Sequence, residues 1–175
     1  MSSLITPRLR LRPVEMADAN ATAALVTRDV AANLSTWKSP MSAADAAARI
    51  ARAQAKLQAG DAIDFAIVSR ADDLLLGWIG LALTEGNNAR LGYGLGAPFR
   101  GRGLMKEAVG AAVPAGAALL DTKRVHALVL KGNAPSIAVL RATGFQLVGE
   151  ERVRLEVART SRLCLRFEWT DGPLS

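Results

Sequence analysis

The sequence predicts one mixed α/β domain, with a largely antiparallel sheet of six or seven strands flanked by helices. Two observations carry this prediction: short apolar or alternating runs recur between turn signals, and alanine-rich segments have helical composition. Of the 175 residues, 50% are hydrophobic and 22% are charged, which is typical of a globular chain. A chain of this length buries about 70% of its unfolded surface, so residues 1–175 are expected to form a single domain.

The first part of the chain is expected to contain a strand and two helices. Leu9–Pro13 alternates apolar and basic residues and ends in proline, which is typical of an edge strand. An alanine-rich helix is expected from Met16 to Val26. A second helix begins with a capping arrangement at Ser42, with Asp45 at the third helical position, and ends at Gly60.

The rest of the chain alternates strands, tight turns and two more helices. Strands are expected at 63–69, 74–84, 89–95, 124–130 and 145–148, helices at about 103–120 and at 134–142, and a closing hairpin with arms 152–157 and 162–169. Pro114 lies inside the first of these helices and is expected to kink it, because proline removes a backbone hydrogen bond.

Composition excludes several classes of protein. No apolar run approaches the roughly 18 residues of a membrane span, and the first residues show no apolar signal segment. A single Cys164 and a single His126 exclude an internal disulfide framework and a Cys/His zinc site. A cytoplasmic protein without a metal is therefore expected.

The charge is basic, with 22 Lys and Arg against 16 Asp and Glu, a net charge of +6. This excess favours an anionic partner such as a phosphorylated cofactor, RNA or a membrane surface. The arginines are dispersed, however, and free use of arginine explains the same excess. Charge alone leaves both interpretations open.

The most informative segment is Arg100–Met105, which lies between an expected strand and an expected helix. Gly101 and Gly103 let backbone approach a ligand closely, and a helix N-terminus attracts phosphate. The alternative is a tight turn that merely needs glycine. Two nucleotide motifs do not match: Arg102 follows Gly101 where a P-loop has lysine, and Lys106 stands where a dinucleotide fingerprint has its third glycine.

Two further motifs flank this segment: Leu91-Gly92-Tyr93-Gly94-Leu95 before it and Asn133-Ala134-Pro135-Ser136 after it, the latter followed by Gly144-Phe145. Together with T-P-R-L-R-L-R-P at 6–13, this constellation resembles the GNAT superfamily of acyl-CoA-dependent N-acetyltransferases. Within the superfamily it is similar to the RimJ/RimL-type branch, named for enzymes that acetylate ribosomal-protein N-termini. The resemblance extends from Thr6 to about Trp169.

The resemblance implies a GNAT-like fold whose sheet is splayed between the fourth and fifth strands. It implies acetyl-CoA as co-substrate and direct transfer of the acetyl group to a primary amine in a ternary complex. The residues implied for binding acetyl-CoA are Tyr93, Gly94, Leu95, Arg100, Gly101, Arg102, Gly103, Leu104, Met105, Asn133 and Ser136, and Trp37 is implied as a substrate-side aromatic.

The sequence departs from the family pattern at three positions. Met105 replaces a small residue, and Gly94 replaces a tryptophan, which widens the expected pocket beside the pantetheine arm. Leu140 stands where many members carry a tyrosine that acts as general acid. Ser136 therefore becomes the candidate donor to the departing thiolate, the alternative being a helix-start hydroxyl that satisfies local amides.

The remaining chemistry needs an oxyanion donor and, for an amine of high pKa, a base. A backbone N–H near Leu95 would serve the oxyanion. Glu151 or Glu156 is the candidate base through a water, the alternative being a surface carboxylate paired with an arginine. His126 and Cys164 are interpreted as packing residues.

The acceptor remains open between a protein N-terminus and a small amine such as a polyamine, an amino acid or an aminoglycoside. The residues expected to contact it, around Asn33–Met41 and in the closing hairpin, are those to which a family resemblance transfers least. Two functions of other classes are also open: a non-catalytic acyl-CoA-binding regulatory domain, and an RNA- or ribosome-binding module that rests on charge alone. No stable nucleic-acid or membrane partner is expected, and a homodimer is left open.

Overall fold

The protein is described here by a computed structural model, which covers residues 2–31, 37, 39–155 and 160–172, with Leu155 covered in its backbone alone. Its described strands form one eight-stranded sheet in the order β1-β2-β3-β4-β5-β6-β8-β7. Neighbours are antiparallel except β5 and β6, which are parallel. The strands are β1 Leu4–Ile5, β2 Leu9–Pro13, β3 Ala62–Ser69, β4 Leu75–Thr84, β5 Asn88–Leu95, β6 Arg124–Leu130, β7 Gln146–Leu155 and β8 Thr160–Thr170.

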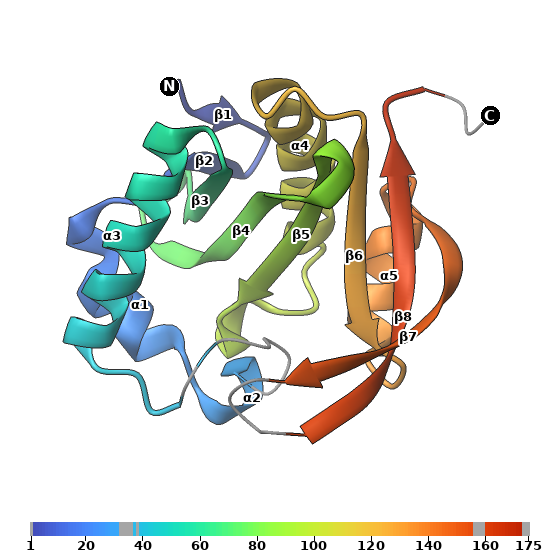
Figure 1. The fold of residues 1–175 in the computed structure, drawn as a ribbon. Coiled ribbons are helices and arrows are strands. Elements are labelled where there is room, and N and C mark those ends of the chain that lie inside the picture. Colours follow the sequence, from blue (N-terminus) through green and yellow to red (C-terminus); the bar gives the residue numbers. More distant parts are fainter. Residues whose placement is uncertain (1, 32–36, 38, 156–159, 173–175) are drawn as a thin grey trace.

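Helices cover both faces of the sheet (Figure 1). On one face lie α1 (Ala19–Leu25), α2 (Arg28–Ala31) and α3 (Ala43–Ala59), and on the other lie α4 (Leu104–Leu119) and α5 (Ala134–Ala142). The ends of α3 confirm the sequence signals. Ser42 and Asp45 form a reciprocal capping box, and Gly60 ends the helix in the left-handed conformation at φ 77°. None of the helices in the described ranges is long and apolar enough to span a membrane.

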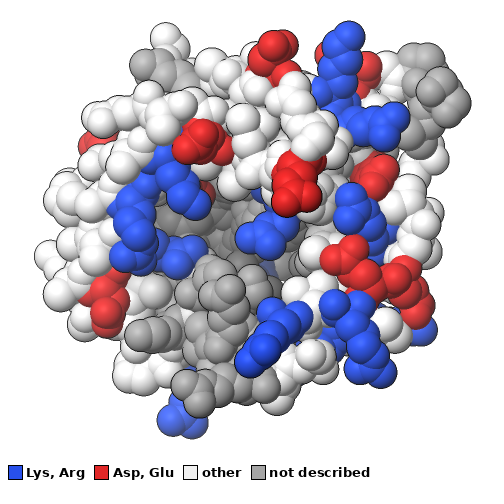
Figure 2. Space-filling view, in the orientation of Figure 1, with Lys and Arg blue, Asp and Glu red and all other residues white. Residues whose placement is uncertain are grey.

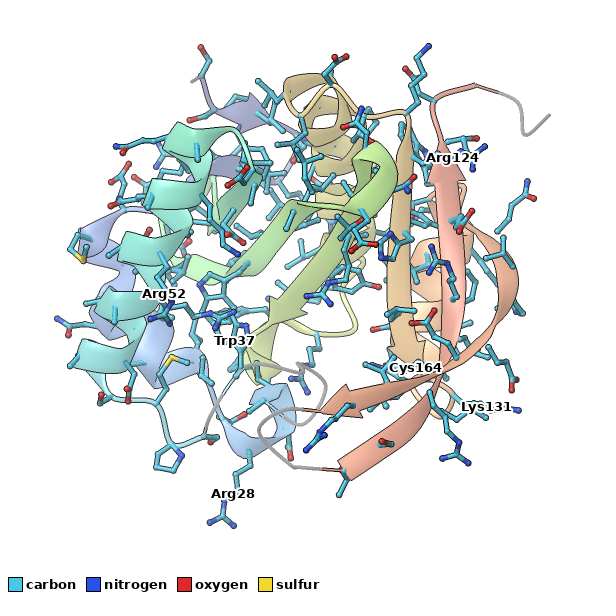
Figure 3. The ribbon with its side chains drawn as sticks, in the orientation of Figure 1. Arg28, Trp37, Arg52, Arg124, Lys131 and Cys164 are labelled. Atoms are coloured by element: carbon cyan, nitrogen blue, oxygen red, sulfur yellow. The ribbon has the colours of Figure 1, made fainter. Side chains whose placement is uncertain are left out.

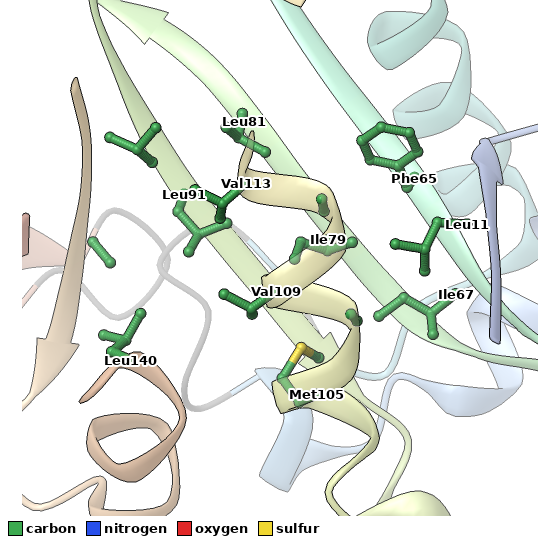
Figure 4. Packing of buried hydrophobic residues seen from close by; sticks show 14 of the residues in the cluster. Leu11, Phe65, Ile67, Ile79, Leu81, Leu91, Met105, Val109, Val113 and Leu140 are labelled. Carbon is green, nitrogen blue, oxygen red and sulfur yellow. The ribbon is translucent and has the colours of Figure 1, made fainter. Parts of the chain in front are cut away.

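The main core lies between the sheet and α4. Val109 and Val113 of α4 pack among Ile79 and Leu81 of β4, and all four are at most 2% exposed (Figure 4). Gly116 brings helix and strand together, because a Cβ at that position would lie 2.9 Å from the Leu81 side chain. A smaller cluster, built around Val14, Val30, Ile50, Val68 and Trp78, fills the space beneath α1–α3.

The sheet is splayed between β5 and β6, as the resemblance implied. Only Ala89 and Arg90 of β5 find partners on β6, opposite Val125 and His126. From Leu91 to Leu95 the two strands diverge (Figure 1). In the sequence-based numbering these are the fourth and fifth strands, since the two-residue strand β1 was not expected.

Other differences are local. Residues 146–148 of the expected short strand and residues 152–155 of the expected first hairpin arm belong instead to one strand, β7, whose pairing with β8 shifts between Leu147 and Gly149. Phe145 precedes this strand, and residues 156 and 157 lie outside the described residues. The helix expected at Met16–Val26 begins as a 3₁₀ turn, Met16–Asp18. Helix α4 continues through Pro114, and the kink expected there stays a prediction.

Candidate functional site

The site begins with the glycine turn, residues 100–103, between β5 and α4. Gly101 and Gly103 have φ values of 75° and 72°, a region that residues with a side chain rarely adopt. A Cβ on Gly101 would meet nothing within 4 Å, and one on Gly103 would meet only the Arg8 Nη2 at 3.7 Å. The turn therefore has free space in front of its backbone.

Helix α4 starts directly at this turn, with Gly103 as its N-cap. The first bond closing the helix runs from the Glu107 N–H to the Gly103 carbonyl, at 3.2 Å. The N–H groups of Leu104, Met105 and Lys106 precede that bond and point out of the helix end, where they attract an anion. The side chains of Leu104 and Met105 are only 7% and 8% exposed, so these two residues offer a ligand their backbone alone.

The N-terminal segment braces the turn. The Glu107 carboxylate accepts hydrogen bonds from the Thr6 hydroxyl at 2.6 Å, from the Arg8 N–H at 2.8 Å and from the Arg8 Nε at 2.7 Å. Arg8 Nη1 also donates to the Arg102 carbonyl at 2.8 Å. Burial raises the pKa of Glu107, but these hydrogen bonds outweigh it and hold the pKa below its usual value.

This brace was missed by sequence reasoning, although its parts carried signals. The T-P-R motif was noted only as typical of a family branch, and Glu107 stands in the first turn of a helix, where a carboxylate is favoured anyway. Pairing Thr6 with Glu107 joins positions 101 residues apart, so no local pattern could identify it.

Two cavities of similar size lie near these elements. One, of about 580 Å³, lies beside the glycine turn, where Arg8, Arg102, Phe99 and Leu104 are among its walls. The other, of about 570 Å³, lies where β6 ends and α5 begins, with Lys131, Asn133 and Arg162 in its lining. Both present arginine or lysine, which suits a polyanionic ligand.

The splay itself is crossed by Tyr93 and lined by Leu95. The Tyr93 hydroxyl donates to the Ser136 carbonyl of α5 at 3.3 Å, and burial raises the pKa of Tyr93 to about 12, so this phenol keeps its proton. The Gly96 N–H donates to Leu76 on β4 at 2.9 Å. Because N–H groups alternate in direction along a strand, the Leu95 N–H points to the other side, toward the splay. Arg100 Nε donates to the Leu95 carbonyl at 3.2 Å and links the splay to the glycine turn.

Asn133 and Ser136 lie at the start of α5. Asn133 is the N-cap, and its side-chain oxygen accepts from the Ser136 N–H at 3.3 Å. Ser136 is half-buried, and within the described ranges no hydrogen bond involves its hydroxyl. The alternative role expected for Ser136, a helix-start hydroxyl that satisfies local amides, is thus performed by the side chain of Asn133.

Glu151 lies on the opposite face of the sheet from Ser136. It stands opposite Cys164 of β8. Leu165 and Phe167 of the same strand point into the α4 core, and side chains alternate along a strand, so Cys164 and Glu151 point away from that core. Arg166 Nη1 lies 3.3 Å from the Glu151 carboxylate. The structure thus separates the two predicted catalytic side chains and pairs Glu151 with an arginine.

Trp37 packs on the face of the sheet that carries α3. Its ring lies 4.8 Å from that of Trp78, and the Arg49 guanidinium of α3 lies 4.2 Å from its centroid. In Figure 3, Trp37 lies between α3 and the strands, with Arg52 nearby. Glu156 and most of the loop Asn33–Met41 lie outside the described residues.

His126 and Cys164 are packing residues, as interpreted. His126 is 9% exposed, and burial together with Arg166 and Arg90 lowers its pKa, so the ring is neutral at pH 7. Burial and the nearby Glu151 raise the pKa of the Cys164 thiol, which is 4% exposed. A protonated, buried thiol is a poor nucleophile.

Comparison with known proteins gives consistent results. A family model described as acetyltransferase (GNAT) domain matches residues 8–146. The uncharacterized N-acetyltransferase p20 of Bacillus licheniformis is 30% identical over 156 residues, which is 85% of either chain. Among solved structures, RimL, a ribosomal L7/L12 α-N-protein acetyltransferase in complex with coenzyme A, has a TM-score of 0.85 at 20% identity over 97% of this chain and 98% of that one. Mycobacterium smegmatis RimJ has a TM-score of 0.81 at 24% identity over 98% and 90%.

Proposed function

The chain belongs to the GNAT acetyltransferase family, and from that membership we propose that it transfers the acetyl group of acetyl-CoA directly to a primary amine in a ternary complex. Residues 1–175 would act as one catalytic domain. The observation that carries the proposal is the glycine turn at the mouth of the splay, where open space meets the N-terminus of α4.

The turn fits a pyrophosphate. Gly101 and Gly103 leave the space that a Cβ would fill, and the amides of Leu104, Met105 and Lys106 point into it. Arg100 and Arg102 are exposed beside it and add positive charge. Acetyl-CoA supplies an activated thioester, and the diverging edges of β5 and β6 give its pantetheine arm a path to the centre of the sheet.

Each chemical task has a candidate within the described residues. The Leu95 N–H is directed at the splay and would stabilise the developing oxyanion. The Ser136 hydroxyl, which has no competing hydrogen bond in the described ranges, would donate to the departing thiolate. Asn133 would orient this helix start, and Tyr93 would line the path from the β5 side.

The acceptor would approach from the face that carries α3, where Trp37 packs against the buried Trp78. Glu151 remains a predicted base on this face, although its pairing with Arg166 makes it less available. The RimL structure named above is that of a ribosomal L7/L12 α-N-protein acetyltransferase, and its similarity supports a protein N-terminal amine as one acceptor to test. Small amines are tested as acceptors as well. The expected cytoplasmic location stays a prediction.

The test has two parts. Calorimetric titration with acetyl-CoA measures binding, and release of coenzyme A is then followed with peptides carrying N-terminal serine or alanine, spermidine and an aminoglycoside as acceptors. We expect binding and transfer to at least one acceptor above the rate of hydrolysis. Binding without transfer to any of them would favour the regulatory acyl-CoA-binding alternative, and no binding would exclude both.

A further inference from the structure

Asp64 is a carboxylate on the acceptor side that has no role in the chemistry described so far. It lies on β3, next along the strand to Ile63 and Phe65, whose side chains belong to the α4 core. Side chains alternate along a strand, so Asp64 points to the face of α3. It is half-buried there.

Two glycines give this carboxylate its space. Gly80 of β4 stands opposite Asp64, and a Cβ on Gly80 would lie only 2.1 Å from Asp64 Oδ1. The carboxylate therefore lies over Gly80, directed from β3 toward β5. Gly92 of β5 stands opposite Gly80, is exposed, and would meet nothing within 4 Å if it carried a Cβ.

Gly80 and Gly92 thus form a floor without side chains between Asp64 and the splay: the carboxylate covers Gly80, and the space over Gly92 is free of the neighbours that a Cβ would meet. Neighbouring strands are about 4.8 Å apart and residues along a strand about 3.3 Å, so the carboxylate lies on the order of 10 Å from the Leu95 N–H. That distance accommodates the acceptor nitrogen and one or two waters. On this face, basic side chains gather along α3 (Figure 2).

The Asp64 carboxylate has no protein partner in the part of the chain that the structure describes: it accepts no hydrogen bond and forms no ion pair within 4 Å. Burial raises its pKa, and the charged groups that act on it, Arg49 and Lys56 of α3, only partly oppose that effect. Glu151, by comparison, lies beyond β6 and β8 on the other side of the splay and is paired with Arg166.

We propose that the floor formed by Gly80 and Gly92 admits the ammonium group of the acceptor and that Asp64 removes its proton through water held over that floor. This inference rests on the proposed function. It names the acceptor class as a primary amine that is protonated at neutral pH.

The step balances in protons and electrons. The ammonium gives one proton through water to the Asp64 carboxylate, which later releases it to solvent. The neutral amine then forms the C–N bond as the C–S bond breaks. The nitrogen loses its second proton, and the thiolate gains one. No oxidant or reductant takes part.

The decisive measurement is the pH dependence of kcat/KM for Asp64→Asn with a peptide acceptor, whose α-amine has a pKa of about 7.7–8.0. Where the amine is protonated, at pH 6.5, we expect at least a tenfold loss relative to the wild type. The ratio should approach one above pH 9, because solvent then supplies the neutral amine. A structural role would give a loss that does not change with pH.

A second variant tests the same carboxylate without removing it. Gly80→Ala would displace the Asp64 side chain, so it should reproduce the pH-dependent loss. Asp61→Asn, an exposed aspartate just before β3, and Gly110→Ala, on the open side of α4, are matched controls expected to keep wild-type profiles. Acetyl-CoA affinity should be unchanged in all four variants.

The outcomes separate this inference from the function on which it rests. A wild-type protein that does not acetylate the peptide, spermidine or the aminoglycoside would overturn both. An active wild type with an equally active Asp64→Asn at pH 6.5, or a pH-dependent loss found only in Glu151→Gln, would overturn the Asp64 assignment alone.

Discussion

At the start of α5, Asn133 and Ser136 have separate roles: Asn133 caps the helix, and Ser136 offers its hydroxyl for chemistry. Asn133 caps the helix by accepting from the Ser136 N–H, which leaves the Ser136 hydroxyl without a hydrogen bond in the described ranges. A residue spared from a structural role can be specialised for chemistry. Substitutions at the two positions should therefore affect different properties.

Ser136→Ala should lower kcat, by about tenfold to a hundredfold because a thiolate needs little help, and leave acetyl-CoA affinity and melting temperature nearly unchanged. Asn133→Ala should instead lower the stability by roughly 0.5–2 kcal/mol through the lost cap. Steady-state kinetics and thermal melts of both variants check this. A stable and fully active Ser136→Ala would assign protonation of the thiolate to solvent.

Glu107 should make stability depend on pH. Its folded pKa lies below the usual value near 4.5, so the folded state binds fewer protons than the unfolded state just below pH 4.5. Stability from this group is complete above that pH and is lost as pH falls toward the folded pKa. Denaturant unfolding between pH 3 and pH 7 should show a smaller acid loss for Glu107→Gln than for the wild type. An equal loss of stability on acidification in Glu107→Gln and in the wild type would contradict a stabilising role of the hydrogen bonds to Glu107.

At the scale of elements, the glycine turn needs glycine for two reasons: a positive φ, and free space for the ligand in front of the backbone. Two substitutions separate these reasons. Gly103→Val introduces strain at φ 72° and fills the space before α4. Gly60→Val, at φ 77° and with nothing within 4 Å, introduces the same strain away from the site. Both should lose on the order of 1–2 kcal/mol of stability.

Only Gly103→Val should also lose acetyl-CoA affinity, which calorimetry on the folded variants measures. We expect this loss to be at least tenfold, because the valine would occupy the place of the pyrophosphate. Unchanged affinity in Gly103→Val would remove the glycine turn from the cofactor site.

Local signals predicted elements well, and long-range pairings explain what was missed. The capping box at Ser42, the helix end at Gly60 and the turn at Gly101 and Gly103 depend on residues a few positions apart. The continuous strand β7 exists because β8 pairs along its whole length, which a run of apolar residues does not reveal. The space for Asp64 likewise depends on Gly80, sixteen positions away and on another strand.

At the scale of the whole molecule, the net charge of +6 is spread over many separate arginines, several of them paired with carboxylates. Binding to nucleic acid should therefore be weak and independent of sequence. Electrostatic contacts weaken steeply with salt, so a fluorescence-anisotropy titration with duplex DNA or RNA should show no complex at about 200 mM salt. A tight complex under those conditions would favour the ribosome-binding alternative.

The splay also divides the sheet into two halves that share few paired residues. Strands β1–β5 and β6–β8 share only two paired positions, Ala89 with Val125 and Arg90 with His126, and α4 and the Tyr93 bond to Ser136 bridge the rest. A ligand that fills the gap from the glycine turn to α5 contacts both halves. It binds the folded state alone, because neither the turn nor the splay exists in the unfolded chain.

Acetyl-CoA should therefore raise the melting temperature of the whole protein in a single transition. At a concentration of 100 times its dissociation constant the expected gain is about 2.7 kcal/mol, which corresponds to roughly 5–10 °C for a chain of this size. Differential scanning calorimetry checks the size of the shift and whether one transition remains. Gly103→Val should show no shift, and Ser136→Ala should show the full shift, since its hydroxyl acts on the leaving group rather than on binding. A shift confined to one of two separate transitions would mean that the ligand contacts only one half of the sheet.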